Sequence, residues 1–71
     1  MIPAYTIKTD SSTTADTVYI GVCNSIDADE TSSLWAITRI TLDGDDVVIE
    51  HAGGNGSPSK KWSERATLTY K

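Results

Sequence analysis

The chain has 71 residues and a formal net charge of −4, with one cysteine, one histidine and no phenylalanine. This length predicts a single small β-domain over residues 1–71, and the composition excludes an intrachain disulfide and disfavours a four-ligand zinc site. The acidic balance argues against nucleic acid as a partner, and no apolar stretch reaches the roughly 20 residues that a membrane-spanning helix needs.

The first two predicted strands flank a polar loop. Residues 4–8 alternate weakly, residues 9–16 are polar, and residues 17–23 are a β-branched and aromatic run typical of a strand. Such a continuous apolar run indicates burial on both faces or an interface on one face. Within it, Gly21 marks either a bulge or the close approach of another backbone. Cys23 ends the run and is expected to be buried as a small hydrophobe.

The longest predicted strand covers residues 34–42, after an acidic polar loop at residues 24–33. Its apolar residues divide between two faces, with Trp35 and Ile37 on one and Ile40 and Leu42 on the other. A bulge near Thr38 and Arg39 would restore a single apolar face. Otherwise the strand twists between two environments.

The third part of the chain begins with a hairpin signal. An Asp43-Gly44 turn joins the long strand to a second β-rich run at residues 47–52. A glycine-rich loop follows at residues 53–59, then a brief turn at residues 60–65 and an alternating closing strand at residues 66–70.

These elements predict an all-β fold. We expect a small twisted antiparallel sheet of four or five strands, curled into a partial barrel or sandwich. The expected core consists of the larger apolar residues of the strands: Val18, Ile20, Val22, Trp35, Ile37, Ile40, Val48, Leu68 and Tyr70.

No residue pattern predicts catalysis, a metal or a cofactor, so we expect the protein not to be an enzyme. The acidic turn at residues 43–46 lacks the spacing of an EF-hand, and its Asp-Gly pair is explained by the hairpin. His51 is the only imidazole and has no nucleophile signature near it. The glycine-rich loop lacks the Gly-Lys-Ser/Thr ending of a phosphate-binding loop.

The C-terminal residues are the best candidates for partner binding. Residues 1–50 hold nine acids and two bases, whereas residues 51–71 hold one acid and four bases, so copies of the chain could meet head to tail unless the clustering is chance. If residues 60–65 are helical, Trp62 and Arg65 share a face, and the arginine stacks or pairs with an acid of a neighbouring subunit. The predicted partner-binding residues are Trp62, Arg65, Lys60, Lys61 and Tyr70. Self-association is expected, because small domains often need added stabilisation.

A longer pattern supports this interpretation. Tyr19-Ile-Gly, Trp35-x-Ile-x-Arg-Ile40, the central Asp-Gly turn, Ala52-x-Gly and Trp62-x-x-Arg-x-x-Leu-x-Tyr70 together resemble small uncharacterised structural proteins of tailed bacteriophages. The resemblance spans residues 18–70. It supplies no catalytic residue.

The resemblance implies a virion protein made in the host cytoplasm. Its most concrete form is a head decoration or cement subunit that binds the shell in many copies, with the major capsid protein or other virion proteins as partners. The alternatives are a carbohydrate- or receptor-binding module of a tail or fibre, and a minor neck or tail component. In the first case Trp62 would anchor the subunit, and Trp62→Ala would loosen attachment without unfolding the monomer.

Overall fold

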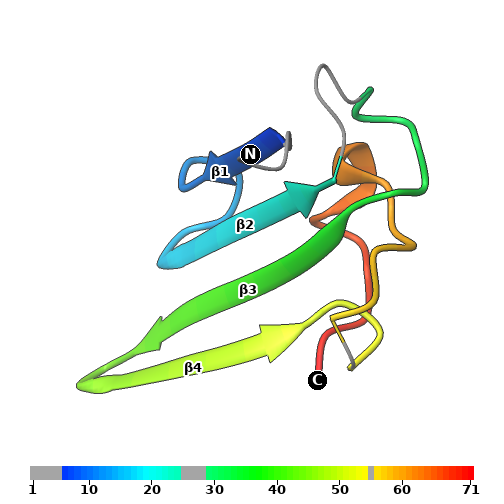
Figure 1. Cartoon of the computed structure of the whole chain (residues 1–71). Coiled ribbons are helices and arrows are strands. Elements are labelled where there is room, and N and C mark those ends of the chain that lie inside the picture. Colours follow the sequence, from blue (N-terminus) through cyan, green and yellow to red (C-terminus); the bar gives the residue numbers. More distant parts are fainter. Residues whose placement is uncertain (1–5, 25–28, 55) are drawn as a thin grey trace, which may run out of the picture.

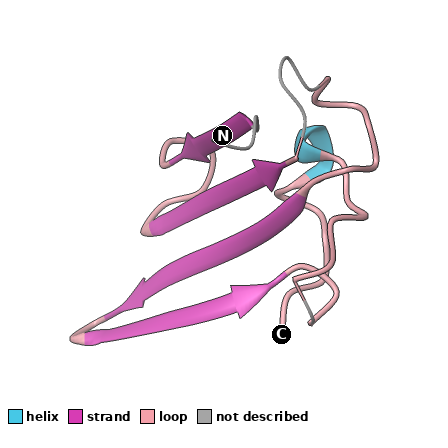
Figure 2. Ribbon diagram, in the orientation of Figure 1, coloured by secondary structure: helices cyan, strands magenta, loops and turns pink. Residues whose placement is uncertain are grey.

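The computed structural model describes residues 6–24, 29–54 and 56–71. Four strands form one antiparallel sheet in chain order: β1 (Thr6–Asp10), β2 (Thr17–Cys23), β3 (Ala36–Asp43) and β4 (Asp46–His51) (Figure 1). The helical content of the described residues is one 3-10 turn, η1 (Trp62–Glu64) (Figure 2). The predicted all-β class with a four-stranded antiparallel sheet is confirmed, and the sheet is not closed into a barrel.

Local sequence signals account for most strand bounds. The apolar run predicted at residues 17–23 coincides with β2. The Asp-Gly signal marks the β3–β4 hairpin, where Asp43 pairs with Asp46 and Gly44 takes a positive φ of 63°. Tight hairpin turns require this left-handed conformation, which glycine adopts without steric cost. The first strand is described from Thr6 to Asp10, and residues 4 and 5 of the strand predicted at residues 4–8 lie outside the described residues.

Of the two alternatives for the long strand, the bulge near Thr38 and Arg39 is wrong. Strand β3 pairs in unbroken register with both neighbours, from Val22↔Ala36 to Thr17↔Thr41 on one side and from Thr38↔His51 to Asp43↔Asp46 on the other. Successive side chains of a regular strand point to opposite faces. Ile37 and Ile40 therefore belong to different faces, and both faces of the sheet carry apolar side chains.

The C-terminal segment, residues 52–71, packs over one face of the sheet, which we call the covered face (Figure 1). It is attached to the sheet by the isolated bridge Trp35↔Lys60 and by backbone hydrogen bonds between His51 and Lys71, and the bridge Ala52↔Tyr70 joins its two ends. The closing strand predicted at residues 66–70 is wrong, because its first residues form a turn, with the Thr67 N–H donating to the Glu64 carbonyl at 2.9 Å, and only Tyr70 makes a bridge, to Ala52. Its alternation serves to point Leu68 and Tyr70 at the core.

The core lies between the covered face and this segment. It contains Tyr19, Cys23, Trp35, Ile37, Ala52, Trp62 and Tyr70, with Leu68 packed against it. Cys23 is buried, as expected. Five predicted core residues are not in this cluster: Val18, Ile20, Val22 and Ile40 are half-buried on the opposite face, and Val48 is 40% exposed. The physical reason is that the chain supplies a second layer to one face only.

Candidate functional site

Trp62, the predicted anchor, is a core residue. Its side chain is 3% exposed, and its ring centroid lies 5.8 Å from that of Trp35 in a tilted arrangement. The ring also lies on Gly21, where an added Cβ would overlap it. The predicted close approach at this glycine therefore exists, but a side chain makes it rather than a backbone. Because the ring is enclosed, the structure offers no exposed Trp62 surface to a partner.

Arg65 is held against the same core. Its guanidinium lies 4.6 Å from the Trp62 ring centroid, and its Nη1 donates to the Trp62 carbonyl at 3.0 Å. The predicted shared face of these two residues is thus present. The Arg65 Nε donates to the Asp10 carboxylate at 2.8 Å, so the acid that pairs with Arg65 belongs to the same chain. Hydrogen bonds from Thr13, Ser12 and Arg65 hold the pKa of Asp10 well below its usual range.

Tyr70 is likewise enclosed, with 8% of its surface exposed. Its hydroxyl donates to the Arg65 carbonyl at 2.7 Å, and the Arg39 guanidinium covers its ring at 4.5 Å from the centroid. Burial, together with the neighbouring Tyr19, raises the pKa of Tyr70 to about 12. Tyr70 therefore closes the core rather than presenting a ring to a ligand.

The two lysines of the predicted set remain at the surface. Lys60 exchanges two backbone hydrogen bonds with Trp35, at 2.9 and 3.0 Å, which fixes it beside the start of β3. Its neighbour Lys61 is exposed. The structure thus brings Trp62, Arg65 and Tyr70 together in the core and leaves Lys60 and Lys61 near the outside. Their part in partner binding stays a prediction.

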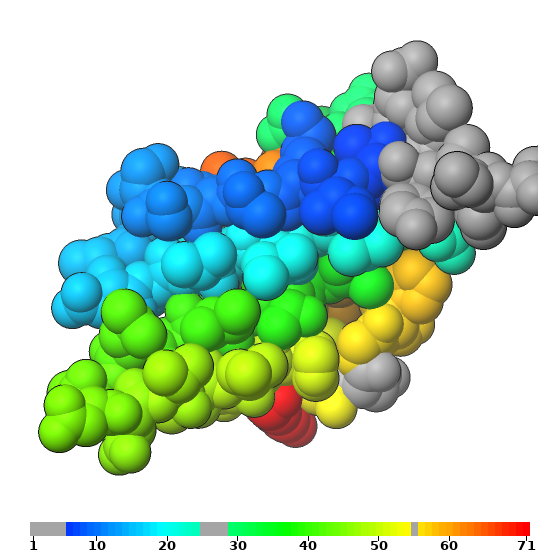
Figure 3. Space-filling model, turned by 60° about the vertical axis from the view of Figure 1, so that its left-hand side comes forward, coloured from blue at the N-terminus to red at the C-terminus, as the bar shows by residue number. Residues whose placement is uncertain are grey.

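A second apolar surface lies on the opposite side of the sheet, which we call the open face. The strand registers assign to it twelve residues: Ile7, Thr9, Val18, Ile20, Val22, Ala36, Thr38, Ile40, Leu42, Val47, Ile49 and His51. Nine are aliphatic, and none carries an acidic group, a lysine or an arginine. Figure 3 shows the four strands side by side, with the C-terminal segment largely behind them.

Several side chains of the open face are exposed to an unusual degree. Ile7 is 57% exposed, Leu42 52%, Val47 58% and Ile49 61%. Soluble monomers rarely expose contiguous apolar patches of more than a few hundred Å², and larger patches mark interaction sites. Two sequence signals pointed to this surface: the continuous apolar run at residues 17–23, and the switch of face between Ile37 and Ile40. The predicted core nevertheless included Val18, Ile20, Val22 and Ile40, which all belong to the open face.

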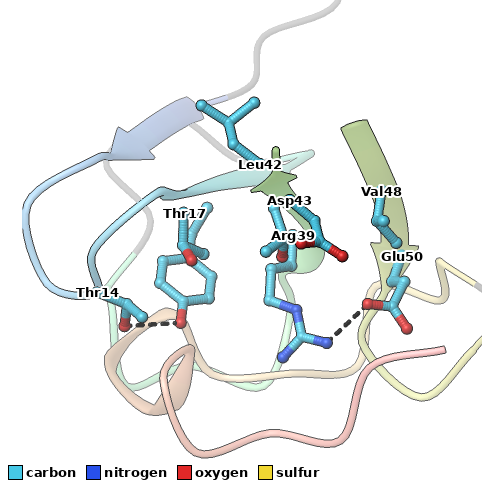
Figure 4. A pocket seen from close by; sticks show the side chains of 9 residues that line it. Thr14, Thr17, Arg39, Leu42, Asp43, Val48 and Glu50 are labelled. Atoms are coloured by element: carbon cyan, nitrogen blue, oxygen red, sulfur yellow. Dashed lines mark hydrogen bonds and ion pairs between the residues drawn. The ribbon is translucent and has the colours of Figure 1, made fainter. Parts of the chain in front are cut away.

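A shallow hollow of about 410 Å³ lies on the covered face, beside the part that the C-terminal segment packs over (Figure 4). Arg39 and Glu50 form an ion pair of 2.7 Å on its wall, and the Thr14 and Tyr19 hydroxyls share a hydrogen bond of 3.1 Å. The Arg39 Nε is buried and has no hydrogen-bond partner among the described residues. Hydroxyls and one ion pair thus dominate the polar lining.

The described residues show no cluster typical of a metal centre. No group of three or more His, Cys, Asp or Glu side chains in the described ranges is placed to hold a metal ion. His51 shares a hydrogen bond of 3.1 Å with Thr38 on the open face. No helix of residues 6–24, 29–54 and 56–71 is long and apolar enough to cross a membrane.

Comparison with known proteins adds no assignment: no family, no curated protein and no solved structure matches the chain.

Proposed function

We propose that this protein is a structural subunit that acts by binding other protein chains, and that it forms part of a tailed-phage particle as a head decoration or cement subunit. The observation that carries the binding role is the open face, where nine aliphatic residues are presented without a formal charge. Interfaces are depleted of charge at their centres, and those between identical subunits are the most apolar. The phage assignment rests on the sequence resemblance alone.

The architecture supports an associated role. The solvated face of an antiparallel sheet normally carries polar side chains, whereas nine of the twelve residues on the open face are aliphatic. The chain has 71 residues, a size at which small domains often depend on partners for stability. The exposed Lys61 and the half-buried Lys60 lie at one end of the sheet and would orient the subunit on an acidic shell.

Localisation in phage particles tests the proposal. An antibody raised against the purified chain is used to probe gradient-purified particles by blotting and by immunogold microscopy. We expect label in many copies over the head. Label at one axial position would instead assign the protein to the neck or tail. Absence of the chain from intact particles would overturn the virion assignment.

A second candidate, a carbohydrate-binding module, is favoured by the hollow on the covered face. Its Thr14, Thr17 and Thr41 hydroxyls and the Arg39–Glu50 pair are suited to a polyhydroxylated ligand. The Tyr19 ring is 3% exposed and provides no stacking platform. Two-dimensional NMR titration with monosaccharides tests this candidate: shifts confined to the hollow support it, and no shifts at millimolar sugar exclude it.

A further inference from the structure

The outer edge of β4 has no strand of the sheet beside it in the described residues, because β4 is the last strand in the order of the sheet (Figure 1). We propose that this edge binds an extended segment of a partner protein as a fifth strand, and that aliphatic residues alternate with lysine or arginine in this segment. The proposal goes beyond the proposed function, since it concerns the edge of the sheet instead of the open face and does not depend on a phage particle.

The backbone of β4 presents hydrogen-bonding groups along this edge. The His51 N–H donates to the Lys71 carbonyl at 3.0 Å, and the Lys71 N–H donates to the His51 carbonyl at 3.1 Å. The backbone groups of His51 therefore point away from β3. Because these directions alternate along a strand, the backbone groups of Val47 and Ile49 also point away from β3.

The backbone groups of Val47 and Ile49 are available to a partner. Among the described residues, no backbone hydrogen bond from outside the sheet reaches either of them. Leu42 confirms their direction, because it lies opposite Val47 but its N–H donates to the Asp16 carbonyl on the other side of β3. Strand addition uses such groups: main-chain hydrogen bonds supply the affinity, and side chains at alternate positions supply the specificity.

The C-terminal residues show that this edge accepts a strand. Residues 69–71 run antiparallel to residues 51–53, with the bridge Ala52↔Tyr70 and a hydrogen bond of 2.9 Å from the Gly53 N–H to the Thr69 carbonyl. They lie in the position of a fifth strand, but only at the end of β4. A partner segment opposite residues 46–50 would lie in line with them.

The aliphatic side chains of β4 are suited to burial by a neighbouring strand. Val47 is 58% exposed, Val48 40% and Ile49 61%, and they point alternately to the open and the covered face. Proteins often protect an edge strand with lysine, proline or a bulge. Strand β4 has no lysine or proline, and its register with β3 is unbroken. A strand added at the edge would contact side chains on both faces, which a layer on one face would not.

The acidic side chains of β4 disfavour a second copy of this strand as the partner. Asp46 and Glu50 point to the same face as Val48. Two copies that both used the backbone groups of Val47 and Ile49 would pair Val47 of one with Ile49 of the other, and would set Asp46 opposite Glu50. Like charges directly opposite each other in a sheet are destabilising, whereas opposite charges are stabilising. The edge therefore favours a basic segment.

The turn before β4 strengthens this preference. Glu50 already pairs with Arg39 at 2.7 Å, but Asp43, Asp45 and Asp46 form no ion pair among the described residues. Asp43 lies directly opposite Asp46. A lysine or arginine of the partner beside Asp46 would offset the repulsion between these two carboxylates. Aliphatic residues at the alternate positions would continue the apolar surface of the open face.

Hydrogen exchange followed by NMR tests the proposal with a synthetic peptide. The probe is acetyl-Lys-Val-Lys-Val-Lys-Val-Lys-amide, and its control is the same peptide with N-methylated valines, which keeps the charge but removes the valine N–H donors. At a probe concentration about ten times its dissociation constant, exchange of the Val47 and Ile49 amides should slow about tenfold. Equal slowing by the N-methylated peptide, or no slowing at millimolar probe, would overturn the proposal.

Two variants assign the binding to the edge and to its charge. Ile49→Pro removes an N–H that β3 does not use, and proline is tolerated at such positions of edge strands. It should abolish the slowing at Val47, whereas Ile49→Val should retain it. Asp46→Asn should weaken probe binding about two- to fivefold, with Glu64→Gln, away from this edge, as the control.

The folding of each variant is checked by circular dichroism. If Ile49→Pro does not fold, the N-methylated peptide and Asp46→Asn still decide the outcome, because neither changes the backbone of the chain. Undiminished binding to a folded Ile49→Pro variant would overturn the assignment to the edge. Equal binding of the peptide with glutamate in place of lysine would overturn the assignment of a basic partner.

Discussion

The Asp10 carboxylate and the Arg65 guanidinium lie 2.8 Å apart although 55 residues separate them in the sequence. Asp10 ends β1 at one edge of the sheet, and Arg65 directly follows η1 in the segment over the covered face. The Asp10 side chain is 9% exposed, and Ser12 and Thr13 donate further hydrogen bonds to it. This pair therefore fastens the C-terminal segment to the edge of the sheet.

The first prediction concerns acid stability. The folded state lowers the pKa of Asp10 from its ordinary value of 3.8. Its contribution to the free energy of unfolding is therefore fully present above about pH 4 and is lost as the pH falls below that value. We expect Asp10→Asn to be less stable near neutrality and to lose less stability on acidification. Urea unfolding from about pH 6 to about pH 2 measures this, with Asp45→Asn in the hairpin turn as the control.

The second prediction separates a core role from an anchoring role for Trp62. Removing a buried tryptophan ring typically costs about 3–5 kcal/mol of the free energy of unfolding. We expect Trp62→Ala to lose that much or to be unfolded, whereas Lys61→Ala, its exposed neighbour, changes stability by less than about 0.5 kcal/mol. Thermal and urea unfolding of the purified variants measure the difference. A stable, folded Trp62→Ala monomer would restore the anchor hypothesis.

The third prediction concerns the contact between Gly21 and Trp62. A Cβ at position 21 would overlap the Trp62 ring and lie 3.0 Å from the Trp35 ring. Both rings are enclosed and cannot move aside freely, so we expect Gly21→Ala to destabilise the fold by about 1–3 kcal/mol. The double variant Gly21→Ala with Trp62→Leu should lose less than the sum of the two single variants, because the smaller side chain makes room. Additive losses would contradict the contact.

The sequence predicted the elements whose signals are local. The β-branched run at residues 17–23 gave the bounds of β2, and the Asp43-Gly44 pair gave the hairpin, because strand propensity and turn geometry act over a few residues. The spacing of Trp62 and Arg65 likewise predicted that the two side chains would meet, and Arg65 does cover the Trp62 ring.

The sequence could not reveal which face of the sheet is covered. Alternation places Ile37 and Ile40 on opposite sides, but contacts between distant parts of the chain decide which side receives a second layer. Those contacts, such as Trp62 against Gly21 and Arg65 with Asp10, join residues more than forty positions apart. The candidate surface was missed for the same reason, since an aliphatic residue of an open face looks like a core residue in the sequence.

The last prediction concerns alkaline stability, which depends on Tyr70. Burial raises the pKa of Tyr70 from 10.0 to about 12, and the hydroxyl donates a hydrogen bond to the Arg65 carbonyl. Because the folded-state pKa lies above the unfolded value, the contribution of this phenol is fully present below about pH 10 and is lost as the pH rises toward 12. Tyr70→Phe should cost about 1 kcal/mol at neutral pH through the lost hydrogen bond. Between about pH 10 and about pH 12, the Tyr70→Phe variant should lose less stability than the unmodified chain, because it has no phenol to ionise. Urea unfolding across this range measures both effects, and parallel slopes for the two proteins would show that Tyr70 ionises as freely in the folded state as in the unfolded one.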